Sequence, residues 1–115
     1  MTLPKPGQAV RGSSTGRPIM AALDLLGRRW VLRIVWELRA CPLTFRQLQE
    51  RCDGMSPTVL NTRLRELRDS GIVASADIGG YALSESGAAL LLALEPLMKW
   101  AGEWERSSAA DAQLP

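Results

Sequence analysis

Residues 43–71 decide the fold, and they read LTFRQLQERCDGMSPTVLNTRLRELRDSG. This stretch predicts two short helices joined by a glycine turn. Thr44 and Gln47 have the spacing of a capping box, which satisfies two backbone N–H groups at a helix start. Ser56 followed by Pro57 predicts a second start, since serine caps well and proline at the first helical position loses no hydrogen bond. The arrangement indicates a helix-turn-helix.

The second of these helices separates apolar from polar side chains. Leu60, Leu64 and Leu67 recur at i, i+4 and i+7, which predicts one buried stripe. The polar residues around the rest of the helix are Thr58, Asn61, Thr62, Arg63, Arg65 and Asp69. Hydroxyl, amide and guanidinium groups near a helix N-terminus suit the reading of base edges in a major groove. An ordinary solvated amphipathic helix has the same pattern, so the surrounding chain must decide.

The composition argues against metal-binding proteins and enzymes. The 115 residues suffice for one domain with a modest core. The chain has no histidine, and Cys41 and Cys52 lack metal-binding spacing, so neither a zinc site nor a histidine-based catalytic triad is expected. We expect no catalytic residues, no metal and no cofactor, and therefore no enzyme. We also expect two reduced, buried thiols, no secretory leader, no membrane span and a cytoplasmic location.

Charge is unevenly distributed along the chain. The net charge is +2, but the first 39 residues hold seven basic and two acidic residues, a balance of +5. The last 45 residues hold two basic and six acidic residues, a balance of −4. An excess of positive charge in the N-terminal part of the chain suits a protein that binds a polyanion on one face. The alternative is that the cations of the first 17 residues only keep a loose tail soluble.

The segments before residue 43 predict a tail and two helices. Residues 1–16 are rich in Gly, Pro, Ser and Thr without periodicity, and we expect them to be disordered. A short helix is expected from Pro18 to Gly27, and a second one from Trp30 to about Ala40.

After residue 71 the spacing of the apolar residues is no longer that of a helix. Residues 72–78 and 81–84 predict two short strands around the turn Gly79-Gly80. A β-hairpin directly behind a helix of this kind is the winged-helix arrangement, which is far more specific than the helix alone.

The last predicted helix begins after Ser84 and ends near Arg106, and residues 107–115 are expected to be frayed. Pro96 should kink or restart it. Its apolar stripe is too wide for one small domain to bury, so we expect it to pack on a partner chain as well.

On these elements, residues 17–106 resemble the HxlR family of bacterial winged-helix transcription regulators, relatives of the MarR group. The matching stretches are LGRRW at 26–30, FRQL at 45–48, MSPTVLNTRLREL at 55–67, SGIV at 70–73 and YALSESG at 81–87. The resemblance implies a mainly α fold with a small β-hairpin, a winged helix-turn-helix that dimerises through its first and last helices.

The resemblance also implies a sequence-specific DNA-binding regulator that acts as a homodimer on a near-palindromic operator. Helix 56–70 would enter the major groove, with half-sites roughly 10 base pairs apart. The residues implied to read bases are Ser56, Pro57, Thr58, Asn61, Thr62 and Arg65. Those implied to contact phosphates are Arg28, Arg29, Thr44, Arg46 and Arg63, and a neighbouring carboxylate is the alternative partner for Arg63. Those implied to form the dimer interface are Ile19, Leu23, Leu97, Trp100 and Trp104.

Two departures from the family pattern leave alternatives open. Arg17 stands where the family often has a cysteine, so redox sensing at that position is not available. The hairpin tip, with Asp77, is short and carries no cation. A winged-helix module that no longer binds DNA and pairs with another protein is therefore the alternative. Also open is a small-molecule effector of unknown identity, since the four tryptophans could line a pocket or belong to the core and dimer contact.

Overall fold

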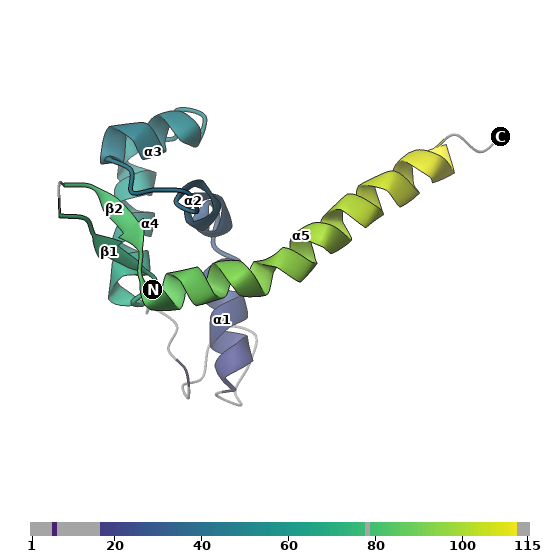
Figure 1. Cartoon of the computed structure of the whole chain (residues 1–115), viewed down its shortest axis with the longest axis horizontal. Helices are drawn as coiled ribbons and strands as arrows, with labels where there is room; N and C mark the ends of the chain where they lie inside the picture. The colour runs from purple at the N-terminus through teal and green to yellow at the C-terminus, as the bar shows by residue number, and fades with distance from the viewer. Residues whose placement is uncertain (1–5, 7–16, 78, 113–115) are drawn as a thin grey trace.

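The computed structural model describes residue 6, residues 17–77 and residues 79–112. The tail predicted for residues 1–16 lies outside the described residues, except for Pro6. The elements in chain order are α1 (Pro18–Leu26), α2 (Val31–Glu37), α3 (Phe45–Arg51), α4 (Pro57–Asp69), β1 (Val73–Ser75), β2 (Tyr81–Leu83) and α5 (Glu85–Ala112). α1–α4 and the hairpin gather at one end of α5, whose far half projects away from them (Figure 1). The predicted fold class, mainly helical with a small antiparallel hairpin, is confirmed.

α3 and α4 form the predicted helix-turn-helix. The Thr44 hydroxyl accepts a hydrogen bond from the Gln47 N–H at 3.1 Å, and the Gln47 side chain accepts one from the Thr44 N–H at 2.9 Å. The turn between the helices requires a left-handed backbone at Gly54, with φ at +68°. α4 begins where the Ser56 hydroxyl accepts from the Val59 N–H at 3.5 Å. Both predicted helix starts are therefore confirmed.

The core lies beneath α4. Leu60, Leu64 and Leu67 are each at most 1% exposed, as their spacing predicts. The Ile72 N–H donates to the Leu67 carbonyl at 2.9 Å, which closes the end of α4. The side chains that pack with them from α2, α3 and the connecting segments include Val31, Ile34, Val35, Leu38, Leu43, Leu48 and Cys52.

The hairpin is shorter than predicted. β1 pairs with β2 antiparallel, and its last residue is Ser75 rather than residue 78. In the loop the Ala76 N–H donates to the Gly80 carbonyl at 3.0 Å and the Ala76 carbonyl accepts from the Gly79 N–H at 3.0 Å, so the loop is wider than a two-residue glycine turn. Leu43 forms an isolated bridge with Tyr81, which ties the hairpin to the segment before α3.

α2 ends earlier than predicted, and Cys41, which follows it, is exposed although it was expected to be buried. The helix ends at Glu37 with Leu38 as its C-cap, not near Ala40. Cys41 follows in an exposed connection, so the expectation that it is buried is wrong. Cys52 is fully buried, as expected, because it follows the last turn of α3 on its core side.

α5 begins at the predicted cap. The Ser84 hydroxyl accepts from the Gly87 N–H at 3.0 Å. Gly87 is needed here because a Cβ would collide with the Ile72 carbonyl oxygen, and this close approach seats α5 against the end of α4.

α5 is longer than predicted, reaching Ala112 instead of Arg106. No glycine or proline follows Arg106 until Pro115, so nothing in residues 107–112 interrupts the helix. The helix continues through Pro96 without restarting, and its axis bends near the middle (Figure 1). Among the described residues, no helix is both long enough and apolar enough to span a bilayer.

Candidate nucleic-acid interface

The outer side of α4 is a polar surface over a buried stripe. All six residues implied to read bases are exposed: Ser56, Pro57, Thr58, Asn61, Thr62 and Arg65. We call this set the reading face. The leucine stripe fixes the rotation of α4, and that rotation turns the reading face to solvent.

Not every polar group on the reading face is available to a ligand. The Thr62 hydroxyl donates to the Thr58 carbonyl at 2.9 Å, and the Ser56 hydroxyl caps the helix. The side chains of Thr58, Asn61 and Arg65 make no hydrogen bond or ion pair to other described residues. Amide and guanidinium groups at such positions can each contact two atoms of one base edge. The chemistry of the face therefore rests on Asn61 and Arg65 first.

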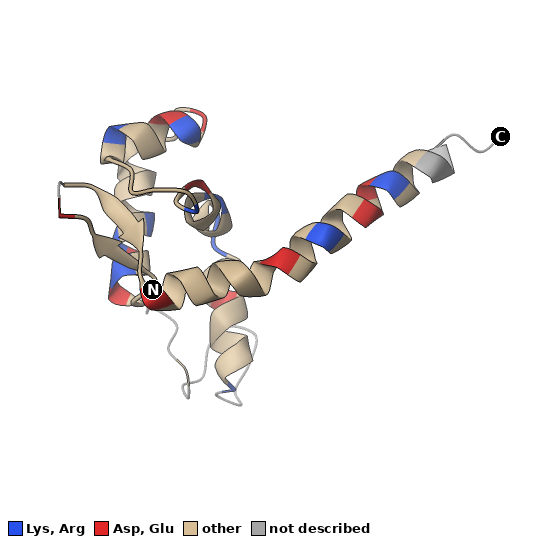
Figure 2. Ribbon diagram, viewed as in Figure 1, with Lys and Arg blue, Asp and Glu red and all other residues tan. Residues whose placement is uncertain are grey.

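The residues implied to contact phosphates divide into two groups. Arg46 on α3 and Arg29 before α2 are exposed, and the Arg29 guanidinium lies 5.6 Å from the Trp30 ring centroid. The Thr44 hydroxyl caps α3 with its oxygen, which leaves its proton to donate. Figure 2 shows basic and acidic residues on α3 and α4, and both signs of charge also along the far half of α5.

Arg28 and Arg63, in contrast, are engaged within the protein. The Arg28 guanidinium bonds to one carboxylate oxygen of Glu66, and the Arg63 guanidinium bonds to the other at 2.5 Å. Arg63 Nε also donates to the Arg29 carbonyl at 2.8 Å. Arg28 lies 3.8 Å from Asp24 as well. For Arg63 the structure shows the neighbouring carboxylate, one of the two roles expected for it, whereas the pairing of Arg28 with Glu66 was not expected from the sequence.

One basic residue of α4 was missed. Arg68 is exposed and lines a hollow of about 330 Å³ with Asn61, Arg65 and Tyr81, between α4 and the hairpin. Arg68 follows Arg65 by three residues and Asn61 by seven, so helical spacing could have placed it beside them. A cation in this position extends the basic surface from the reading face toward the hairpin.

The residues implied to form a dimer interface are exposed and apolar. Ile19 and Leu23 of α1 are 59% and 56% exposed, and Leu97 of α5 is 50% exposed. Trp100 and Trp104 are 54% and 61% exposed, and their rings stack with centroids 5.5 Å apart. Large apolar side chains exposed in this way are typical of protein contact surfaces.

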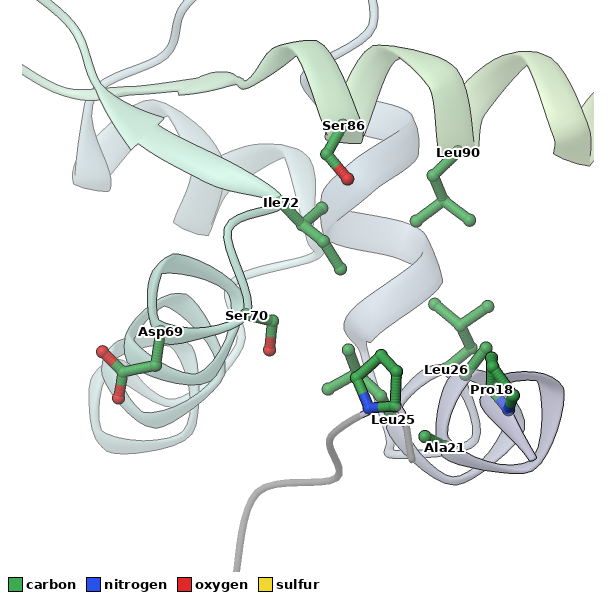
Figure 3. A pocket seen from close by; sticks show the side chains of 11 residues that line it. Pro18, Ala21, Leu25, Leu26, Asp69, Ser70, Ile72, Ser86 and Leu90 are labelled. Atoms are coloured by element: carbon green, nitrogen blue, oxygen red, sulfur yellow. The ribbon is translucent and has the colours of Figure 1, made fainter. Parts of the chain in front are cut away.

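A separate cavity lies between α1, the end of α4 and the start of α5 (Figure 3). Its volume is about 580 Å³, within the usual range of small-molecule sites. Figure 3 shows apolar side chains from α1 and α5 facing the cavity, with Asp69 and Ser70 at the end of α4 and Ser86 on α5. Trp30, Trp36, Trp100 and Trp104 do not line it.

The buried Cys52 thiol lacks the surroundings of a reactive site. Burial raises the pKa of the Cys52 thiol, although the nearby Arg33 guanidinium acts in the opposite direction. Among the described residues, no group of three or more Cys, Asp or Glu side chains is placed to hold a metal ion.

Comparison with known proteins adds the family. The HxlR-like helix-turn-helix family model matches residues 25–109. The chain is 34% identical over 96 residues to the HTH-type transcriptional regulator YvaP of Bacillus subtilis, covering 78% of this chain and 89% of that protein. The quinone-bound structure of YodB from B. subtilis superposes with a TM-score of 0.69 at 32% identity, covering 74% of this chain and 94% of that one.

A MarR-family regulator from Enterococcus faecalis superposes with a TM-score of 0.72 at 26% identity, covering 88% of this chain and 97% of that one. This family has the helix-turn-helix and the hairpin that the structure shows, and the match extends over most of the chain. The chain belongs to the HxlR-like helix-turn-helix family and is a transcriptional regulator, not an enzyme.

Proposed function

We propose that this regulator binds a near-palindromic operator as a homodimer, with one α4 in the major groove for each half-site. The observation that carries the proposal is the reading face: an exposed row of small polar side chains and Arg65 over three fully buried leucines. A side chain that reads base edges must be exposed, while its helix must be held firmly from behind.

The dimer is proposed from the exposed apolar residues of α1 and α5. A monomer would leave two stacked tryptophans and three aliphatic side chains in water. Covering them with the same surface of a second copy gives a twofold symmetric pair. Two recognition helices related in this way match half-sites about 34–36 Å apart, which is roughly one turn of DNA.

Phosphate contacts are proposed first for Arg29, Thr44 and Arg46, and Arg68 joins them because of its place beside Arg65. Arg28 and Arg63 are less available, because both already bond to Glu66. The hairpin tip carries Asp77 and no cation, so most affinity is expected to come from α3, α4 and the segment before α2.

The test is selection of duplexes from a random library, followed by gel shifts at several salt concentrations. We expect a selected near-palindrome whose affinity falls steeply with salt, because each neutralised phosphate releases counterions. If the protein retains no duplex even at low salt, the proposal is refuted. The alternative, a winged-helix module that binds another protein and not DNA, would then stand.

An effector is proposed for the cavity of Figure 3. The cavity is mainly apolar with Asp69 and two serines at its margin, which suits a small apolar molecule with a polar end. YodB, a relative, has been crystallised with a bound quinone. We expect saturable binding of the dye 1-anilinonaphthalene-8-sulfonate, lost in Ala22→Phe, which would fill the cavity. Unchanged dye binding by this variant would place the site elsewhere.

A further inference from the structure

A cluster of four charged side chains links the end of α1 to α4. Glu66 projects from α4 on the side between the leucine stripe and the reading face, and each of its carboxylate oxygens bonds to a different arginine, Arg28 or Arg63. Arg28 is also paired with Asp24, one turn back on α1. Among the described residues, two positive and two negative charges meet in this cluster. We call these four residues the clasp.

The clasp is largely withdrawn from water. The side chains of Asp24, Arg28 and Glu66 are 11–14% exposed, and that of Arg63 is 22% exposed. Burying an ion pair gives little net stability, because desolvating the charges offsets their attraction. Such groups are better suited to selecting one arrangement of the elements they join, since a paired carboxylate is directional and an apolar contact is not.

The clasp lies between the helix proposed to contact the second copy and the helix proposed to read DNA. Arg28 follows the C-cap of α1, Gly27, and α1 carries Ile19 and Leu23, which are proposed to contact the second copy. Glu66 lies one residue after Arg65 of the reading face. A change in the angle between α1 and α4 would therefore change the distance between the two reading faces of a dimer.

We infer that the clasp is a positioning device: Glu66, held by Arg28 and Arg63, sets the angle of the recognition helix to α1 and thereby the half-site spacing that the dimer accepts. This inference rests on the proposed function. It gives Arg28 a role in spacing selectivity and not in phosphate binding.

The test compares operators that differ only in spacing. A duplex is first selected with the wild-type protein, and versions with one base pair added or removed between half-sites are then made. Each added pair moves a half-site by about 3.4 Å and rotates it by about 35°. The wild type is expected to prefer the selected spacing by at least about tenfold, because a rigid dimer cannot follow this displacement. In Glu66→Gln the preference should fall below about threefold.

The matched control is Glu50→Gln, which removes the same charge from an exposed position on α3. It should keep the spacing preference of the wild type. A merely structural role of Glu66 would lower the folded fraction and weaken all spacings equally, leaving the ratio unchanged. If Glu66→Gln does not fold, the same ratio measured on Arg28→Met decides, and Arg28→Lys, which keeps a charge near Glu66, should restore part of the preference.

The outcomes separate the two proposals. Failure of the wild type to select any duplex refutes the proposed function. A folded, dimeric Glu66→Gln that binds the selected operator with undiminished spacing preference overturns the positioning role alone.

Discussion

Replacing Trp104 with arginine should separate the proposed dimer. Trp104 is 61% exposed and stacks on Trp100, and both belong to the C-terminal half of α5. A tryptophan covers about 150–250 Å² when fully buried, so an interface could still bury roughly 90–150 Å² of this side chain. At about 25 cal/mol per Å², that area corresponds to roughly 2–4 kcal/mol.

Twofold symmetry counts this contribution twice, once from each copy. The substitution should therefore cost at least about 4 kcal/mol, which raises the dimer dissociation constant by roughly 1,000-fold or more. Placing a charge in an apolar contact adds to that cost. The fold should persist, because Trp104 contributes nothing to the buried core.

Sedimentation velocity over a range of concentrations is the assay, with circular dichroism to check folding. Glu95→Gln is the control, since it makes the same change of net charge nine residues earlier, on the opposite side of the helix. The control should remain a dimer. A Trp104→Arg protein that dimerises as tightly as the control would refute the assignment of this surface to the interface.

Three further predictions concern single side chains. Arg65→Ala should cost about 1–3 kcal/mol on the selected operator and much less on random DNA in gel shifts, and equal losses on both would make Arg65 a phosphate contact. Arg46→Ala should reduce the slope of log affinity against log salt by about 1. Arg28→Met should leave this slope unchanged, because Arg28 is paired with Glu66. A reduced slope for Arg28→Met would show that Arg28 contacts a phosphate after all. A thiol reagent at pH 8 should modify one cysteine quickly, the exposed Cys41, and reach Cys52 only on unfolding, since burial raises the pKa of that thiol; two fast equivalents would contradict the burial.

Local signals predicted most of the helix-turn-helix. The capping box of Thr44 and Gln47 and the Ser56-Pro57 start each depend on residues within one helical turn, so the sequence contains the whole interaction. The leucine stripe of α4 could be predicted for a similar reason, since helical spacing alone decides which side chains share a face. Exposure of the reading face follows from the same periodicity.

Elements whose limits are set by turn geometry were predicted less well. β1 ends at Ser75 because the loop closes between Ala76 and Gly80, a geometry that β-propensity does not encode. α2 ends at Glu37 and leaves Cys41 exposed, although its apolar neighbours in sequence suggested burial. In each case the chain leaves the element through a turn whose hydrogen bonds are not specified by helix or strand propensity.

The arginines show most clearly why a site cannot be assigned from residue type alone. Arg28 and Arg29 are adjacent and equally basic, and the family resemblance implies a phosphate contact for both. The carboxylate that distinguishes them belongs to Glu66, 38 residues after Arg28, and only the packing of α4 against the end of α1 brings it into reach. Arg29 points its charge to the surface over Trp30, whereas its carbonyl receives Arg63. Because a guanidinium that is already paired must break that pair to bind a phosphate, the two neighbours differ in what they can offer to DNA.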